Sequence, residues 1–342
     1  MAARVILPGI LGLALSFAPV SRAADQLPPG GKFSISKGTV TAKEFAAAFE
    51  TASGMKLDVS AVEVGLMVPA DLKDVGYWAA LDHLATHTNS RLAITGGRIA
   101  FKSGAATLPA SVNGPFRVAA TEVVLSRDLA AGTTVCDLHL ELAWLPTVIV
   151  FRTDTAPTID SLTDDTGAKL TASSAAARTH TSGITAPLIV RPQGVKRAAK
   201  SLNVAGSVQV TIADELLTFQ FDAAGKPPLA AAKQKGVGVT VRKIKTAGAD
   251  LLVEVQLDYP KAAVVWESFE DVYWTRNNRL RLVPPKGEPI PADAAEYNDR
   301  SITYTFKTRA GKIRADWKLE YQTPGPMREV KVPFELKGIE LP

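Results

Sequence analysis

Two histidines with helical spacing are the first residues in this sequence that could do chemistry. His83 and His87 are four positions apart in a segment with helical periodicity, so their rings would share one face and could hold a metal ion together. A zinc-protease helix carries glutamate beside the first histidine, where this chain has Leu84. Asp82 cannot orient His83 as a general base, because adjacent helix residues do not face each other. We therefore expect solvent-facing histidines, and a metal-dependent hydrolase is the third of three functional hypotheses.

Paired carboxylates, which can act as an acid and a base, occur at Asp164-Asp165 and at Glu270-Asp271. The first pair is followed by Thr166-Gly167, a composition typical of a turn. A calcium ion would need more oxygen ligands than one turn supplies. The sequence also lacks a Gly-x-Ser-x-Gly elbow, a phosphate-binding loop and a dinucleotide fingerprint. These observations predict a non-enzymatic protein with no cofactor and no bound metal.

Aromatic residues gather in one short stretch near the C-terminal end, and they are the candidate binding residues: Trp266, Phe269, Tyr273 and Trp274. Aromatic rings on a surface can stack on sugars or accept a partner's strand, but they also dominate protein cores. Alternation places Trp266 with Val264 and Trp274 with Val272, so part of the cluster should face inward. Glycan binding through these aromatics is the second functional hypothesis.

The elements that would position the histidines begin at Lys32. Residues 32–36 alternate polar and apolar side chains, as in a strand with one buried face. Thr41 and Glu44 then form a capping-box pattern, and apolar residues recur at helical spacing from Phe45 up to Gly54. This spacing predicts a helix over residues 42–53 that ends at a left-handed glycine.

The same segment continues with a second set of signals. Strands are expected over residues 55–60 and 64–68, and a helix over residues 77–88. A closing hairpin is expected at residues 91–101, because Gly96 and Gly97 permit the positive φ angles of a tight turn. The predicted order is therefore β-α-β-β-α-β-β.

In this order, residues 32–103 resemble the secretin/TonB short N-terminal domain. The matching residues are Phe33, Ile35, Phe45, Phe49, Gly54-Met55-Lys56-Leu57, Trp78, Leu81, Leu84, Leu92, Ile94, Ile99 and Phe101. The resemblance is one of pattern, and it implies a periplasmic docking element that engages signalling partners or neighbouring secretin subunits. No barrel or pore segment follows here, so transport and channel functions are not implied.

The rest of the chain consists of short alternating runs separated by turn residues, a pattern typical of β-sandwiches. Pro- and Gly-containing stretches at residues 102–114 and 222–236 divide it. The run from Val208 to Phe221 parallels the run from Met327 to Phe334, which suggests tandem copies. We therefore expect an α+β fold in which two immunoglobulin-like β-sandwich domains, at residues 115–223 and 236–342, follow the small module. A single larger β-domain is the alternative.

Residues 1–23 have the features of an export signal. Arg4 precedes an apolar run, and Ser21-Arg22-Ala23 places small residues at the −3 and −1 positions of a cleavage site. A membrane anchor is the alternative, although the apolar run is shorter than the roughly 20 residues of a spanning helix. We expect a periplasmic or secreted protein without an integral membrane segment after cleavage.

Charge and cysteine content narrow the choice of partners. Removal of Arg4 and Arg22 lowers the formal net charge from +5 to +3, and the remaining basic residues are scattered, which argues against nucleic-acid binding. Cys136 is the single cysteine and shares its alternation face with Leu138 and Leu140, so we expect a buried, inert thiol. The first functional hypothesis is an exported interaction or scaffold protein whose partner is another protein of the cell envelope.

Overall fold

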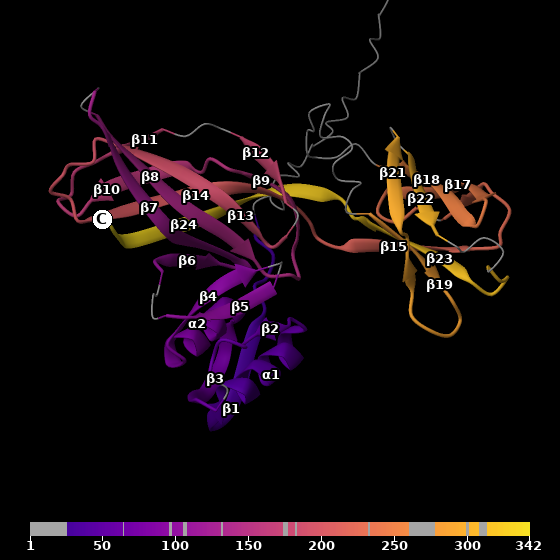
Figure 1. Ribbon diagram of the computed structural model, residues 1–342, viewed down its shortest axis with the longest axis horizontal. Coiled ribbons are helices and arrows are strands. Elements are labelled where there is room, and N and C mark those ends of the chain that lie inside the picture. Colours follow the sequence, from indigo (N-terminus) through magenta and orange to yellow (C-terminus); the bar gives the residue numbers. More distant parts are fainter. Residues whose placement is uncertain are drawn as a thin grey trace, which may run out of the picture.

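The computed structural model describes residues 26–342 apart from residues 64, 96–97, 105–107, 131–132, 174–176, 182, 232, 260–277, 299–300 and 308–312. Strands dominate the described chain, with two helices near its N-terminal end. Figure 1 shows three parts: a small module that contains both helices, a β-sandwich against which it lies, and a second β-sandwich to one side. Neither of these helices is long and apolar enough to cross a membrane.

The module follows the predicted order of elements: β1 (Lys32–Thr41), α1 (Ala42–Ser53), β2 (Leu57–Asp58), β3 (Met67–Gly76), α2 (Tyr77–His87), β4 (Ser90–Thr95) and β5 (Arg98–Ser103). β1 and β3 form an antiparallel ribbon, and β2, β5 and β4 form a second sheet in which β2 runs parallel to β5. The ribbon is longer than the strands expected at residues 32–36 and 64–68. Gly38, at φ 64°, allows β1 to bulge and still continue its pairing with β3.

Helix α1 begins and ends where the sequence predicts. The Thr41 hydroxyl accepts a hydrogen bond from the Glu44 amide at 3.2 Å, and the Glu44 carboxylate accepts one from the Thr41 amide at 2.9 Å. Gly54 adopts φ 70° and donates its amide to the Glu50 carbonyl. The buried face of α1 places Phe45 against Phe33, with ring centroids 5.3 Å apart. The predicted capping box and glycine stop are confirmed.

The first sandwich consists of two five-stranded sheets. Its strands are β6 (Ala110–Asn113), β7 (Phe116–Asp128), β8 (Thr133–Trp144), β9 (Ile149–Asp154), β10 (Thr158–Asp164), β11 (Thr171–Ser173), β12 (Arg178–His180), β13 (Thr185–Gln193), β14 (Ser201–Ala213) and β24 (Met327–Glu340). One sheet has the order β11-β13-β8-β7-β6, and the other has the order β10-β14-β9-β12 with β24 beside β14. Cys136 lies in the core between them with Leu138, and burial raises the pKa of its thiol.

The second sandwich has its own core. Its strands are β15 (Leu216–Asp222), β16 (Leu229–Ala230), β17 (Gly238–Ala247), β18 (Asp250–Asp258), β19 (Arg279–Val283), β20 (Ile290–Pro291), β21 (Ala294–Asn298), β22 (Ser301–Phe306) and β23 (Lys318–Pro324). They form sheets of order β15-β23-β19-β20 and β16-β17-β18-β22-β21. Phe219, Val253, Phe306 and Tyr321 are among the side chains buried between the two sheets.

The strand pairing departs from the predicted boundaries at 223 and 236 in two elements. β15, expected in the first sandwich, pairs with β23 of the second. β24, expected to end the second sandwich, pairs with β14 from Ser201 opposite Glu340 to Ala213 opposite Met327. The second sandwich is therefore inserted between two neighbouring strands of the first. The apparent repeat at 208–221 and 327–334 arises because β14 and β24 face one core and carry the same alternation. Its last part, residues 216–221, belongs to β15 and faces the second core.

Candidate functional site

The four aromatic candidates, Trp266, Phe269, Tyr273 and Trp274, lie within residues 260–277, outside the described residues, as does the carboxylate pair Glu270-Asp271. The adjoining Asn278 is described and is 5% exposed. Its side chain donates to the Tyr321 hydroxyl at 2.8 Å and accepts from the Thr323 hydroxyl at 3.0 Å. Asn278 therefore closes a polar network inside the second sandwich.

The histidine pair is held by backbone carbonyl groups. The Nε2 atom of His83 lies 2.8 Å from the Pro69 carbonyl oxygen, and its ring stacks on Phe45. The Nδ1 atom of His87 lies 2.9 Å from the carbonyl oxygen of His83. His87 is exposed, but His83 is half-buried, so the prediction of two solvent-facing rings is wrong for His83. Within the described ranges, no three or more His, Cys, Asp or Glu residues form a group that could hold a metal ion.

The carboxylate pair at Asp164-Asp165 is confirmed as a turn. One oxygen of Asp164 accepts hydrogen bonds from the Thr166 hydroxyl at 2.6 Å and from the Thr166 and Ala168 amides at 2.9 Å. The Thr166 hydroxyl contributes most to holding the pKa of Asp164 below its usual value. Asp165 accepts from the Lys200 amide at 3.0 Å. Both side chains therefore accept hydrogen bonds from backbone amides, Asp164 within the turn and Asp165 from Lys200.

The interface between the module and the first sandwich joins them into one core. The Trp78 indole nitrogen, on α2, donates to the Pro115 carbonyl at 2.8 Å. The buried Arg117 guanidinium lies 3.5 Å from the carboxylate of Asp82. Burial raises the pKa of Asp82 and of Glu141, and Arg117 opposes this effect in both. The sequence did not assign Trp78 to this interface, although a buried indole N–H needs an acceptor.

The segment before β1 packs against the turn between β6 and β7, which contains Gly114 and Pro115. A Cβ atom on Gly30 would collide with the carbonyl oxygen of Gly114, and one on Gly31 would collide with the Tyr77 ring. Gly31 and Gly114 also adopt φ values of 69° and 58°. Glycine at these positions therefore allows the chain to cross from the sandwich to the module at backbone contact distance.

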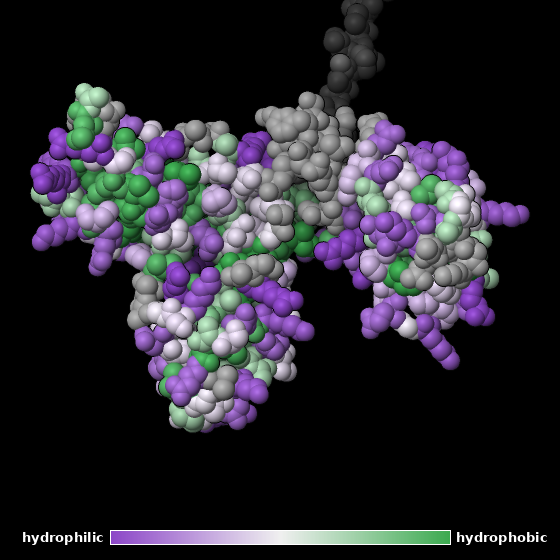
Figure 2. Space-filling view, viewed as in Figure 1, coloured by the Kyte–Doolittle hydropathy of each residue, from purple (hydrophilic) through white to green (hydrophobic). Residues whose placement is uncertain are grey.

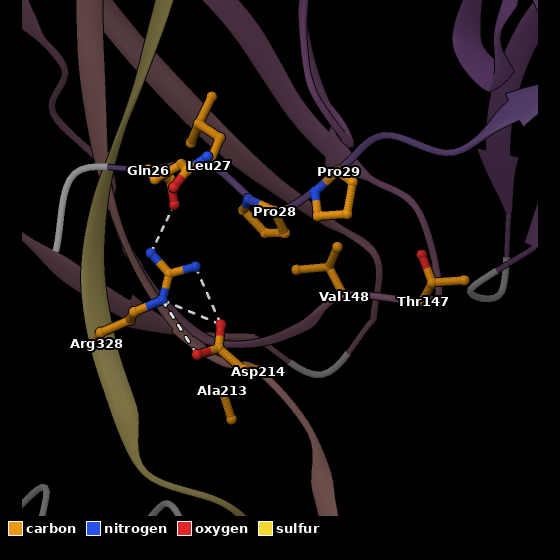
Figure 3. Close-up of a pocket in the computed structure, with 9 residues that line it drawn as sticks. All are labelled: Gln26, Leu27, Pro28, Pro29, Thr147, Val148, Ala213, Asp214 and Arg328. Atoms are coloured by element: carbon orange, nitrogen blue, oxygen red, sulfur yellow. Dashed lines mark hydrogen bonds and ion pairs between the residues drawn. The ribbon is translucent and has the colours of Figure 1, made fainter. Parts of the chain in front are cut away.

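A pocket of about 480 Å³ lies where this leading segment meets both connections to the second sandwich. Figure 3 shows Arg328 between Asp214 and the Gln26 backbone, with Pro28 and Val148 on the opposite side. The Arg328 guanidinium donates to the Gln26 carbonyl at 2.7 Å and, through two nitrogens, to the Asp214 carboxylate at 3.0 Å. Because its donors already have acceptors within the chain, Arg328 acts as a clamp that ties the leading segment to the ends of β14 and β24, where both connections to the second sandwich begin.

Removal of this clamp should loosen the second sandwich. We expect Arg328→Ala to broaden the distribution of distances between spin labels on the two sandwiches, measured by double electron–electron resonance. The cost in unfolding free energy should be small, roughly 0.5–1 kcal/mol, because the Asp214 side chain is 59% exposed. Lys318→Ala, which removes the exposed pair with Asp222 inside the second sandwich, is the matched control and should leave the distances unchanged. An unchanged distribution in Arg328→Ala would show that the clamp does not fix the orientation.

The outer face of the β1–β3 ribbon is exposed along both strands. Phe33, Ile35 and Val68 point inward under the helices, whereas the intervening residues of both strands are exposed. A depression of about 650 Å³ follows Ser34–Ser36 and Asp71–Lys73 across this face. Within the described residues, neither strand pairs with a third strand. The arrangement offers polar side chains and free strand edges to a partner.

Comparisons with known proteins give no family for this chain. No protein-family model matches it, and no curated protein matches it. Among solved structures, one chain is from a structure titled as the manganese lipoxygenase of Gaeumannomyces graminis with part of the zonadhesin of Komagataella pastoris. That chain is 7% identical with a TM-score of 0.12, and the match covers 64% of this chain and 92% of the other. A TM-score this low carries no argument about fold or activity.

Proposed function

We propose that this chain is an exported, non-enzymatic interaction protein of the cell envelope, and that residues 32–103 are its docking module. The observation that carries the proposal is the two-stranded β1–β3 ribbon. A sheet edge presents unpaired amide and carbonyl groups, which is the usual requirement for recognition by strand addition. The resemblance to the secretin/TonB short N-terminal domain supports the same role.

The attachment of the module also supports docking. Trp78 and Arg117 fix the module on the first sandwich through α2, which leaves the ribbon free of this interface. In Figure 1 the ribbon lies at the end of the module remote from the first sandwich. A rigid mount with an exposed distal edge presents a binding surface at little cost in ordering entropy.

Site-specific photo-crosslinking in the native host tests the proposal. A photoreactive residue at Ser36, which is exposed on β1, should give a discrete adduct with an envelope protein. The same residue at Glu296, which is exposed on β21 of the second sandwich, is the control. The adduct partner, once identified and purified, should bind the wild-type protein and lose roughly tenfold or more in affinity for the ribbon variant Ser34→Pro/Ser36→Pro. Equal adducts at both positions, or unchanged affinity for a folded ribbon variant, would rule out docking through the ribbon.

A further inference from the structure

A groove of about 720 Å³ opens on the first sandwich, between β7 and the end of β24. Its apolar lining includes Leu108, Pro109, Ala120, Val123, Ile339 and Leu341. Figure 2 shows hydrophobic residues gathered on this face of the first sandwich, over the region where Figure 1 places β7 and β24. The groove belongs to a different part of the molecule from the β1–β3 ribbon.

The groove is bounded by the edges of β7 and β24, which the short strand β6 covers only in part. β6 pairs with β7 only from Phe116 to Ala119, and among the described residues the bond from the Ala120 amide to the Pro109 carbonyl is the last one on that side. β6 also meets β24, through its Asn113 and Ser111 side chains, at Pro333 and Glu335. Past these points, no described strand pairs with β7 or β24 on the groove side.

Bulges on both strands explain why the edges part at this level. The pairing of β7 with β8 shifts between Ala120 and Glu122, and the pairing of β24 with β14 shifts close to Gly338, which adopts φ 65°. An extra residue bends a strand and increases its twist. β7 and β24 therefore diverge beyond the end of β6, and the groove continues the line of that short strand.

The charges at the groove select among extended peptides. Glu122 and Glu340 line it from opposite strands, and both are exposed. The described residues lining the groove include no lysine or arginine. An occupant that alternates apolar with basic side chains would place the apolar ones near Val123 and Ile339 and the basic ones near these carboxylates.

We propose that this groove is an acceptor site for an extended, basic-apolar segment of a partner protein, which adds to the free edge of β7 as a continuation of β6. The site does not depend on docking through the ribbon. Backbone pairing would supply affinity, and the two glutamates would supply the preference for basic side chains. Strand addition of this kind also removes an exposed edge that a stable protein otherwise has to protect.

Three synthetic peptides test the proposal with the full chain. The probe is acetyl-Lys-Val-Lys-Val-Thr-Val-Lys-amide; the second peptide has glutamate in place of each lysine, and the third is the probe with N-methylated valines. We expect the probe to bind saturably and to slow hydrogen exchange of β7 amides beyond Ala120. The N-methylated peptide keeps the charge but loses backbone donors. Its affinity for the protein should therefore be lower than that of the probe by about tenfold or more.

Charge-reversal variants complete the design. Glu122→Lys/Glu340→Lys should weaken the probe roughly tenfold and favour the glutamate peptide. Glu296→Lys, on β21 of the second sandwich, reverses a similarly exposed charge. It should change neither the affinity for the probe nor that for the glutamate peptide. Equal binding of the probe and its N-methylated form would overturn the proposal by showing charge attraction alone. Slower hydrogen exchange in the β1–β3 ribbon instead of β7 would also overturn it. So would slower exchange caused by self-association without peptide, or a lack of saturable binding.

Discussion

A fragment of residues 214–326 is expected to fold by itself, whereas a fragment of residues 236–342 is not. The first fragment contains all the described strands of the second sandwich and its separate core. The second fragment lacks β15, whose Leu217, Phe219 and Phe221 are buried in that core. Burial of each such side chain contributes about 1.5–3 kcal/mol, so their joint loss rivals the 5–15 kcal/mol stability of a typical domain.

The fragment at 236–342 carries a second defect. It retains β24 without β14, which leaves Val330, Val332 and Phe334 without the sheet that buries them. Near-ultraviolet circular dichroism and urea unfolding should show a cooperative transition for residues 214–326 and none for residues 236–342. Phe219→Ala in the fragment of residues 214–326 is the control, and it should lower the urea midpoint without abolishing the transition. Cooperative folding of residues 236–342 would contradict the insertion of the second sandwich.

Trp78→Ala should destabilise the module and the first sandwich together. The side chain is 2% exposed and joins both parts, so its truncation leaves a cavity and removes one of the two hydrogen bonds that the Pro115 carbonyl accepts. Removal of a buried tryptophan costs about 3–5 kcal/mol. Trp78→Phe keeps most of the ring and loses the hydrogen bond, for which we expect a smaller cost of about 1 kcal/mol plus a repacking term.

Urea unfolding of the full chain separates these effects. Trp78→Ala should shift the transition of the joined module and first sandwich and leave that of the second sandwich in place. Trp317→Ala, a half-buried tryptophan of the second sandwich, should do the reverse. If Trp78→Ala shifts neither transition, or shifts only a transition of the module alone, the shared core is not a cooperative unit.

Local signals in the sequence predicted the helices of the module well. The Thr41–Glu44 pair and Gly54 define both ends of α1 within a few neighbouring residues, so no distant contact is needed to recognise them. The buried face of α2 is equally local. The half-burial of His83 was missed because it depends on Pro69 and Phe45, which come from other elements.

Strand partners were much harder to predict than strands. Alternation shows that Val208 and Val332 face a core, but it does not show that they face the same one from adjacent strands. β24 pairs with a strand more than a hundred positions earlier in the chain, and the spacing of residues in the sequence does not indicate that pairing. The candidate groove escaped notice for the same reason, since it forms from the segment before β6, the middle of β7 and the end of β24.

The two connections to the second sandwich lie side by side. Ala213 faces Met327 at the end of the β14–β24 ladder, and the Gly325 amide donates to the Glu215 carbonyl at 2.9 Å just beyond it. Tension applied to the second sandwich would therefore pull β14 and β24 in the same direction from the same end. Neither strand would be peeled from the other, and the load would pass into the sheet through both.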